Sequence, residues 1–139
     1  MSITRAMCTS FKQEILQGTH NLLTDTLKVA LYTSSASLGP GTTAYTTMGE
    51  VVGSGYTAGG KTLTGVAITS TGLTAMVDFD DVEWVSASFT TRGALIYNAS
   101  KSNKAVAVLT FGSDLTVSGS SFVITMPEVT PSTAILRIQ

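Results

Sequence analysis

The first 18 residues carry a spacing of apolar side chains that predicts a helix over residues 3–17. Apolar residues recur there at every fourth position, and polar residues such as Lys12 fill the opposite side. Gly18 follows as a residue well suited to the position just past a helix end. We expect the apolar stripe either to lie on a sheet or to belong to an arm that docks on a neighbouring subunit. The stripe consists of Ile3, Met7, Phe11 and Ile15.

From residue 27 onward the apolar residues follow the two-residue period of β-strands. In the segment 27–33, for example, Leu27, Val29 and Leu31 share one face. No second helical pattern follows residue 18, and because parallel strands need long crossover connections, an α/β fold is disfavoured. The expected strands cover residues 27–33, 61–69, 73–79, 82–85, 89–98, 105–111, 122–126 and 134–138, with a break at residues 70–72 and a turn at residues 118–120.

The strands at 89–98 and 105–111 are predicted to form a hairpin whose loop is residues 98–103. The second of them is apolar on both faces, which indicates a central strand. The pattern as a whole predicts a mainly-β single domain over residues 1–139, either a β-sandwich or a jelly-roll-like barrel with one N-terminal α-helix. The helix or arm would occupy residues 1–18 and the β-sandwich residues 27–139.

Residues 34–60 interrupt the strand pattern with many Ser, Thr and Gly residues, and we expect a long loop there with one short strand at 45–52. Long loops in compact domains are usually functional or form interfaces. The loop contains one charged residue, Glu50. We therefore expect this loop and the N-terminal helix to contact partner subunits, with the loop ordered only where a partner covers it. On this hypothesis, removal of residues 1–17 leaves a folded domain.

The low content of charged residues restricts the classes of function. Charged residues make up 12% of the chain and the net charge is −1, so no basic excess favours nucleic-acid binding. The single cysteine, Cys8, and the single histidine, His20, rule out an intrachain disulfide, a cysteine-rich zinc site and a histidine pair. The N-terminal segment lacks the apolar core of a signal peptide, and no stretch is long enough to span a bilayer.

Residues 55–62 match the letters of a phosphate-binding loop, G-x-x-x-x-G-K-T. That loop needs a following helix whose N-terminal amides face the phosphates. Here a β-branched, glycine-interrupted segment follows, so we interpret the match as a glycine-rich turn before a strand, with Tyr56 as a packing or contact residue. Nucleotide binding is disfavoured.

An acidic run at residues 78–83 offers oxygen ligands for a cation, but it lacks the spacing of a calcium-binding loop. We interpret it as an exposed turn and leave open whether Asp78, Asp80 and Asp81 bind an ion. No set of residues for nucleophilic catalysis is present, because His20 lies in a linker and no nucleophile elbow occurs. We expect no enzymatic activity, no cofactor and no resident metal, and we expect Cys8 to be a small buried hydrophobe.

Large side chains that often anchor interfaces are few. Trp84, Tyr97 and Arg92 are candidates, since Trp, Tyr and Arg dominate contact energies, although core packing is an equal alternative for the first two. The candidate interface residues are Ile3, Met7, Phe11, Ile15, Tyr45, Tyr56, Trp84 and Arg92.

Several segments together resemble a family of small virion structural proteins of tailed bacteriophages. They are ITRAMCTSFK at 3–12, ALYTSSA at 30–36, TTAY at 42–45, GYTAGG at 55–60, RGALIYN at 92–98 and NKAVAVL at 103–109. The resemblance covers nearly the whole chain. It implies a virion component assembled in the host cytoplasm, without enzymatic activity or cofactor. The implied partners are the major capsid protein or other virion subunits and further copies of the chain, as a dimer or trimer, with no direct nucleic-acid or membrane contact.

The small size of the chain restricts its location within the particle. A compact β-domain of 139 residues is too small for a major capsid subunit and has no fibrous repeat. A capsid decoration, or cement, protein that stabilises the outer shell fits best. A tail or head–tail connector component is the alternative. A carbohydrate-binding β-sandwich module ranks lower, because one Trp and four Tyr supply few aromatic platforms.

Overall fold

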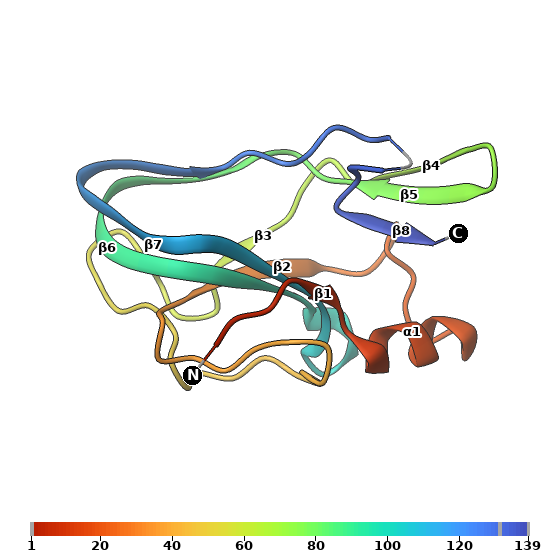
Figure 1. The fold of residues 1–139 in the computed structure, drawn as a ribbon, viewed down its shortest axis with the longest axis horizontal. Helices are drawn as coiled ribbons and strands as arrows, with labels where there is room; N and C mark the ends of the chain where they lie inside the picture. The colour runs from red at the N-terminus through yellow and green to blue at the C-terminus, as the bar shows by residue number, and fades with distance from the viewer. Residues whose placement is uncertain (1, 131, 139) are drawn as a thin grey trace.

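The computed structural model describes residues 2–130 and 132–138, and it shows a mainly-β chain with two antiparallel sheets and a single helix (Figure 1). One sheet has the strand order β1-β7-β6-β2-β3 and the other β4-β5-β8. The mainly-β single domain is confirmed, but the sheets do not close into a barrel. The elements are β1 Ala6–Met7, α1 Thr9–Leu16, β2 Leu27–Tyr32, β3 Lys61–Thr62, β4 Ala67–Thr71, β5 Thr74–Asp78, β6 Val82–Asn98, the 3₁₀ turn η1 Ala99–Lys101, β7 Lys104–Ile124 and β8 Leu136–Ile138.

One long hairpin, β6 with β7, supplies both layers of the fold. Its pairing runs from Asn98 opposite Lys104 to Val82 opposite Ile124, with register shifts along the way. In Figure 1 the two strands run beside β2 in the lower layer, bend together at the left and return through the upper layer toward β5. Bulges allow such a bend because they locally increase twist and curvature. The ribbon therefore folds over its own face and encloses the core.

This continuity corrects the expected strand list. The segments 82–85 and 89–98 form one strand, as do 105–111 and 122–126. The register shifts on either side of Ala87, next to Ser86 at φ 50°, carry β6 through the expected break. The expected turn at 118–120 lies inside β7, where Gly119 has φ +62°. A glycine in that conformation bends the strand without ending its pairing.

The small sheet also differs from the sequence prediction. The expected strand at 61–69 is divided into β3 and β4, with Gly65 at φ +65° between them. The β4–β5 hairpin turns at Gly72 and Leu73, one residue later than the expected break at 70–72. Gly72 has φ +60°, the conformation that a tight two-residue hairpin turn requires at its first central position. In contrast, β2 lies within the predicted range 27–33 and the hairpin loop at 98–103 is confirmed.

The core lies between the layers and contains most of the aromatic side chains. Trp84 and Phe89 from the returning part of β6 pack within 6.0 Å of the ring centroid of Phe122 on β7. Trp84 is 1% exposed and Tyr97 is 2% exposed. For both residues core packing is therefore the correct alternative, and neither offers surface to a partner.

The N-terminal segment is only partly helical, which corrects the prediction of a helix over 3–17. Residues before Thr9 are extended: Ala6 and Met7 pair with β7, and the Thr4 amide donates to the Leu38 carbonyl at 2.9 Å. The backbone amides of this segment form hydrogen bonds outside a helix. The apolar stripe is therefore divided between an extended segment, which carries Ile3 and Met7, and the helix. Only Phe11 and Ile15 of the stripe lie on α1.

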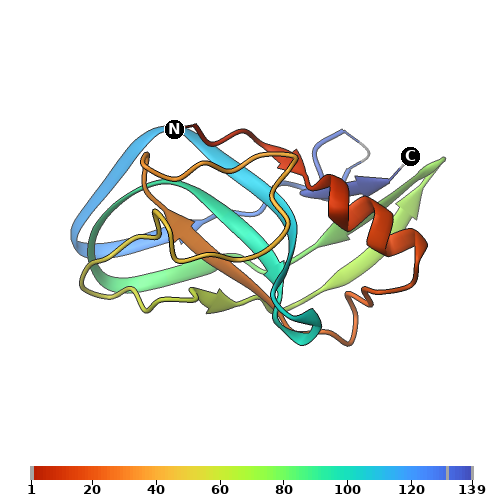
Figure 2. The same ribbon diagram turned by 90° about the horizontal axis from the view of Figure 1, so that it is seen from below.

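The same segment packs in the core, which favours the alternative that the stripe lies on the sheet, while the folding of a chain without residues 1–17 stays a prediction. Phe11 is 1% exposed and Cys8 is fully buried. Burial raises the pKa of the Cys8 thiol to about 11, with a further contribution from the Glu14 carboxylate, so the side chain behaves as the expected neutral hydrophobe. Figure 2 shows α1 beside the end of the molecule that carries β4, β5 and β8. Removal of residues 1–17 would open this end.

We expect Phe11→Ala to lower the free energy of unfolding by about 3–4 kcal/mol, because a buried ring is lost and a cavity remains. Leu16→Ala is the matched control on the same helix, since Leu16 is 88% exposed, and we expect a change of no more than about 0.5 kcal/mol. Urea denaturation followed by circular dichroism measures both. Equal stability of the two variants would show that α1 is not part of the core.

Candidate functional site

The long loop over residues 34–60 is fixed to the sheet by one carboxylate. Glu50 is 8% exposed and accepts three hydrogen bonds. They come from the Tyr45 hydroxyl at 2.6 Å, the Tyr56 hydroxyl at 2.5 Å and the Gly59 amide at 2.8 Å. The predicted strand at 45–52 is absent, since this part of the loop makes only isolated bridges such as Tyr32 with Glu50. These contacts hold the loop on the sheet within the chain itself, and the expected contact of the loop with a partner subunit stays a prediction.

All four tyrosines of the chain gather around Glu50. The rings of Tyr45 and Tyr97 stack with centroids 4.7 Å apart. The Tyr32 hydroxyl donates to the Thr46 carbonyl and the Tyr97 hydroxyl to the Gly59 carbonyl, each at 2.6 Å. Burial, together with the charge of Glu50, raises the pKa of each tyrosine, so the phenols remain neutral donors. Tyr45 and Tyr56, expected at an interface, hold the loop in place.

The phosphate-loop match is explained by the same cluster. The Gly59 amide, which such a loop would offer to a phosphate, already donates to Glu50. A Cβ on Gly60 would lie 1.8 Å from the Val29 carbonyl oxygen, so glycine is needed there for close approach of the loop to β2. Lys61 then begins strand β3 and no helix follows. The interpretation as a glycine-rich turn before a strand, with Tyr56 packed against it, is confirmed.

A second polar network joins the end of α1 to the β6–β7 loop. His20 has a fully buried side chain whose Nε2 lies 2.9 Å from a Glu14 carboxylate oxygen. Its Nδ1 faces the Asn98 amide nitrogen at 2.9 Å, and because that group is a donor, Nδ1 accepts and the proton lies on Nε2. The Asn98 amide also donates to Asp25, which receives Lys101 Nζ at 3.0 Å. Every member of this network has a structural partner.

The acidic run at residues 78–83 lies at the end of β5 and the start of β6. Asp80 and Asp81 are exposed, and the Asp81 carboxylate accepts the Met126 amide at 2.7 Å. Among residues 2–130 and 132–138, no three His, Cys, Asp or Glu side chains converge as a metal site requires. The Asp80 carboxylate accepts the Thr64 hydroxyl at 3.3 Å. No helix of the described chain is long and apolar enough to cross a membrane.

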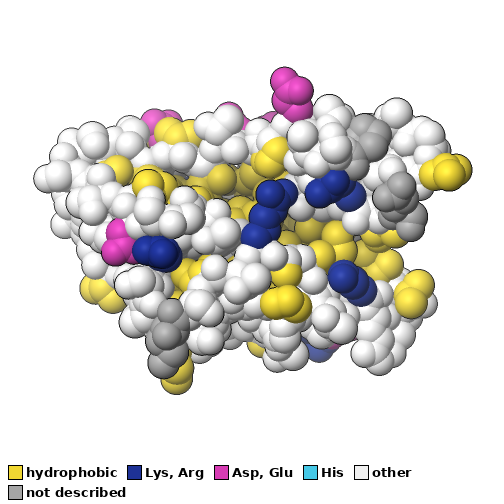
Figure 3. Space-filling view, viewed as in Figure 1, with side chains coloured by type: hydrophobic (Ala, Val, Ile, Leu, Met, Phe, Trp, Pro, Cys, Tyr) yellow, Lys and Arg dark blue, Asp and Glu magenta, His cyan; other side chains and the backbone are white. Residues whose placement is uncertain are grey.

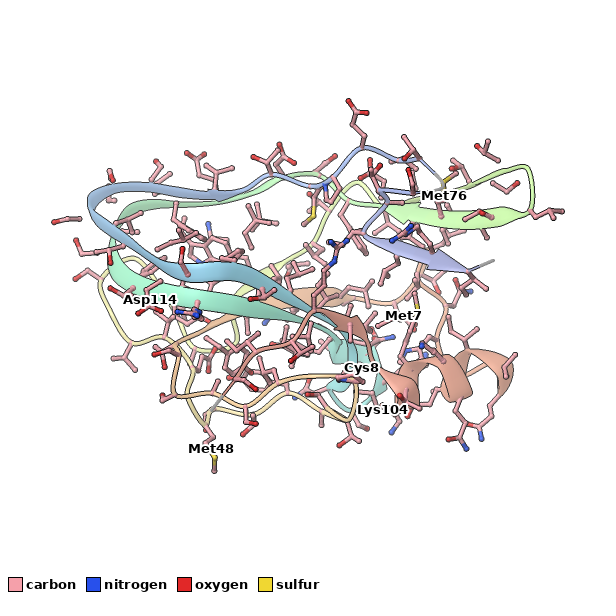
Figure 4. The ribbon with its side chains drawn as sticks, viewed as in Figure 1. Met7, Cys8, Met48, Met76, Lys104 and Asp114 are labelled. Carbon is pink, nitrogen blue, oxygen red and sulfur yellow. The ribbon has the colours of Figure 1, made fainter. Side chains whose placement is uncertain are left out.

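A groove lies on the open side of the fold, between the layers. Its apolar part, about 380 Å³, lies between α1 and the three-stranded sheet. Its central part, about 410 Å³, continues along β1 and β7, and the two parts share Met7 and Arg137. Figure 4 places Met7 and Met76 on opposite sides of this gap. The groove exists because the sheets do not close.

The rim of the apolar part carries large side chains that are exposed to solvent. Ile138 on β8 and Ile68 on β4 line it and are about half exposed. Leu73, at the tip of the β4–β5 hairpin and outside the lining, is 91% exposed. Leu16, at the end of α1, lies at the same end of the molecule (Figures 1 and 2). Apolar surface at the mouth of an apolar groove is typical of a docking site.

The groove is lined by three of the candidate interface residues, Met7, Phe11 and Ile15, of which Phe11 is itself buried in the core. Ile3 and Arg92 lie apart, around a separate hollow, and Arg92 forms an exposed ion pair with Asp114 at 3.3 Å. The other candidates lie in the core or in the Glu50 cluster. Sequence reasoning missed Arg5, Lys12 and Arg137 of the groove, and no local motif marks them, because they are far apart in the chain.

The chain matches no protein-family model, no curated protein and no solved structure.

We expect Glu50→Ala to lower the free energy of unfolding by about 2–4 kcal/mol, because Tyr45, Tyr56 and the Gly59 amide lose a charged acceptor. Faster amide hydrogen exchange should be confined mainly to residues 44–60. Asp114→Ala removes a carboxylate from an exposed pair and should cost less than about 1 kcal/mol. If Glu50→Ala matches this control in both measurements, the carboxylate does not hold the loop.

The Asp25 network predicts a pH dependence. Partial burial raises the pKa of Asp25, but hydrogen bonds from Asn21, Asn98 and Lys101 and the Lys101 charge outweigh it and lower the pKa to about 2. The unfolded chain then binds more protons than the folded one between about pH 4 and 2, so stability falls as the pH is lowered through that window. Asp25→Asn should cost about 1–2 kcal/mol at pH 5 and progressively less toward pH 2. A pH-independent difference in urea midpoints would contradict the assignment.

Proposed function

We propose that this chain is a structural subunit of a tailed-bacteriophage virion and that it decorates the outer shell of the capsid. The observation that carries the proposal is the open groove with its exposed apolar rim, a surface suited to docking on another protein. The resemblance of the sequence to small virion structural proteins of tailed bacteriophages supports the same function. The low charge of the chain, 12% of residues, also favours a surface that other subunits cover.

The fold suits a docking role because its rigidity does not depend on the groove. The bent β6–β7 ribbon forms both layers, and none of the residues that hydrogen-bond Glu50 lines the groove. A partner that fills the groove would remove Ile68, Ile138 and the apolar floor from water at little cost in conformational entropy. Burial of such a preformed surface gives each copy a modest affinity, and many copies together stabilise a shell.

Gold-labelled antibodies against the chain, imaged on intact virions by cryo-electron microscopy, test the proposal. Label spread over the capsid surface is the expected result. Label confined to one vertex or to the tail would contradict decoration of the capsid and would indicate a tail or head–tail connector component. Particles that carry no label, from cells in which the chain is made, would overturn the virion assignment.

A further inference from the structure

The central part of the groove gathers positive charge. Arg5, Lys12 and Arg137 line it, three of the eight Lys and Arg residues of the chain, and its lining contains no Asp or Glu. Figure 3 shows Lys and Arg side chains around a hollow whose floor is apolar. In a chain whose net charge is −1, this is a local concentration of one sign.

The three cations come from separate elements that only the fold brings together. Arg5 precedes β1, Lys12 lies on α1 and Arg137 lies on β8. Within the described residues, Arg5 and Lys12 take part in no ion pair. Like charges that converge in a concave surface repel one another and raise the local potential, which attracts an anionic ligand.

Apolar side chains beneath the cations restrict what that ligand is. Met7, Leu109 and Ile135 line the same stretch, and the groove continues into the apolar part under Phe11 and Met76. A nucleic-acid backbone offers phosphates but no aliphatic side chains for such a floor. A polypeptide that carries both carboxylates and aliphatic side chains matches the two properties together.

The sheet edge beside the groove favours an extended segment. Among the described residues β8 pairs with β5 alone, so it is an edge strand of the small sheet. The backbone groups of an edge strand are available to an added strand, which is a common mode of peptide recognition. An extended peptide also places alternate side chains on opposite sides, one set toward the apolar floor and the other toward the cations.

We propose that the groove between β1, α1 and β8 binds an extended acidic segment of a neighbouring virion subunit, with its carboxylates on Arg5 and Lys12 and its aliphatic side chains on the floor. This inference rests on the proposed function, which supplies the neighbouring subunit. Charge-assisted hydrogen bonds to the cations would set the orientation of the segment, and burial of the aliphatic side chains would supply most of the affinity.

Binding of the purified, fluorescently labelled chain to particles that lack it, measured by co-sedimentation, tests the inference. The double variant Arg5→Gln/Lys12→Gln removes two positive charges from the groove, and we expect it to bind about tenfold or more weakly. Lys61→Gln/Lys104→Gln removes two positive charges outside the groove lining and should bind like the unaltered chain. Circular dichroism and thermal unfolding confirm that both variants are folded.

The outcomes separate the two proposals. If the unaltered chain does not bind particles, the virion function and the groove inference both fail. If it binds and both double variants bind equally well, the virion function stands and the groove inference is overturned.

Two further measurements identify the occupant. Cross-linking from a photoreactive residue at position 109 should capture an acidic segment of another virion protein. Capture of a second copy of this chain would overturn the inference in favour of self-association. Competition by a single-stranded DNA oligonucleotide that depends on Arg5 and Lys12 would overturn it in favour of a nucleic-acid site.

Discussion

The continuous pairing of β6 with β7 is the constraint on which the rest of the structure depends. Because both strands bend together without losing their pairing, one ribbon forms parts of both layers and brings Trp84 and Phe122 over the strands of the larger sheet. β2 extends the lower layer and the small sheet continues the upper one. A ribbon that folds over itself closes at its bend and leaves the opposite side open, which is where the groove lies.

The Glu50 cluster holds the long polar loop over residues 34–60 on the larger sheet. A buried carboxylate is costly unless hydrogen bonds satisfy it, and here two phenols and a backbone amide do so. The arrangement ties the loop to β2 and β6 through Tyr56, Tyr32 and Tyr97. These contacts fix the loop on the larger sheet, while some of its side chains, such as Met48 and Val52, are exposed at the surface.

Part of the fold could be predicted because local patterns specify it. The two-residue apolar period of β2, the hairpin loop after Asn98 and the absence of helical spacing beyond residue 18 all depend on neighbouring residues. The predictions failed where distant backbone competes with local preference. Ile3 and Met7 fit a helical stripe, yet the segment around them is extended because β7 and the residue 38–40 region accept its amide hydrogen bonds.

The sequence by itself determined the fold class, the low charge of the chain and the glycine-rich turn before a strand at residues 55–62, because each follows from residue types and short spacings. Only the tertiary structure decided that Trp84 and Phe11 are core residues, that Glu50 collects three donors, and that Arg5, Lys12 and Arg137 face one groove. These features join residues from separate elements across the bend of a long ribbon. Their proximity depends on where the bulges of β6 and β7 fall, which short-range patterns along the chain do not encode.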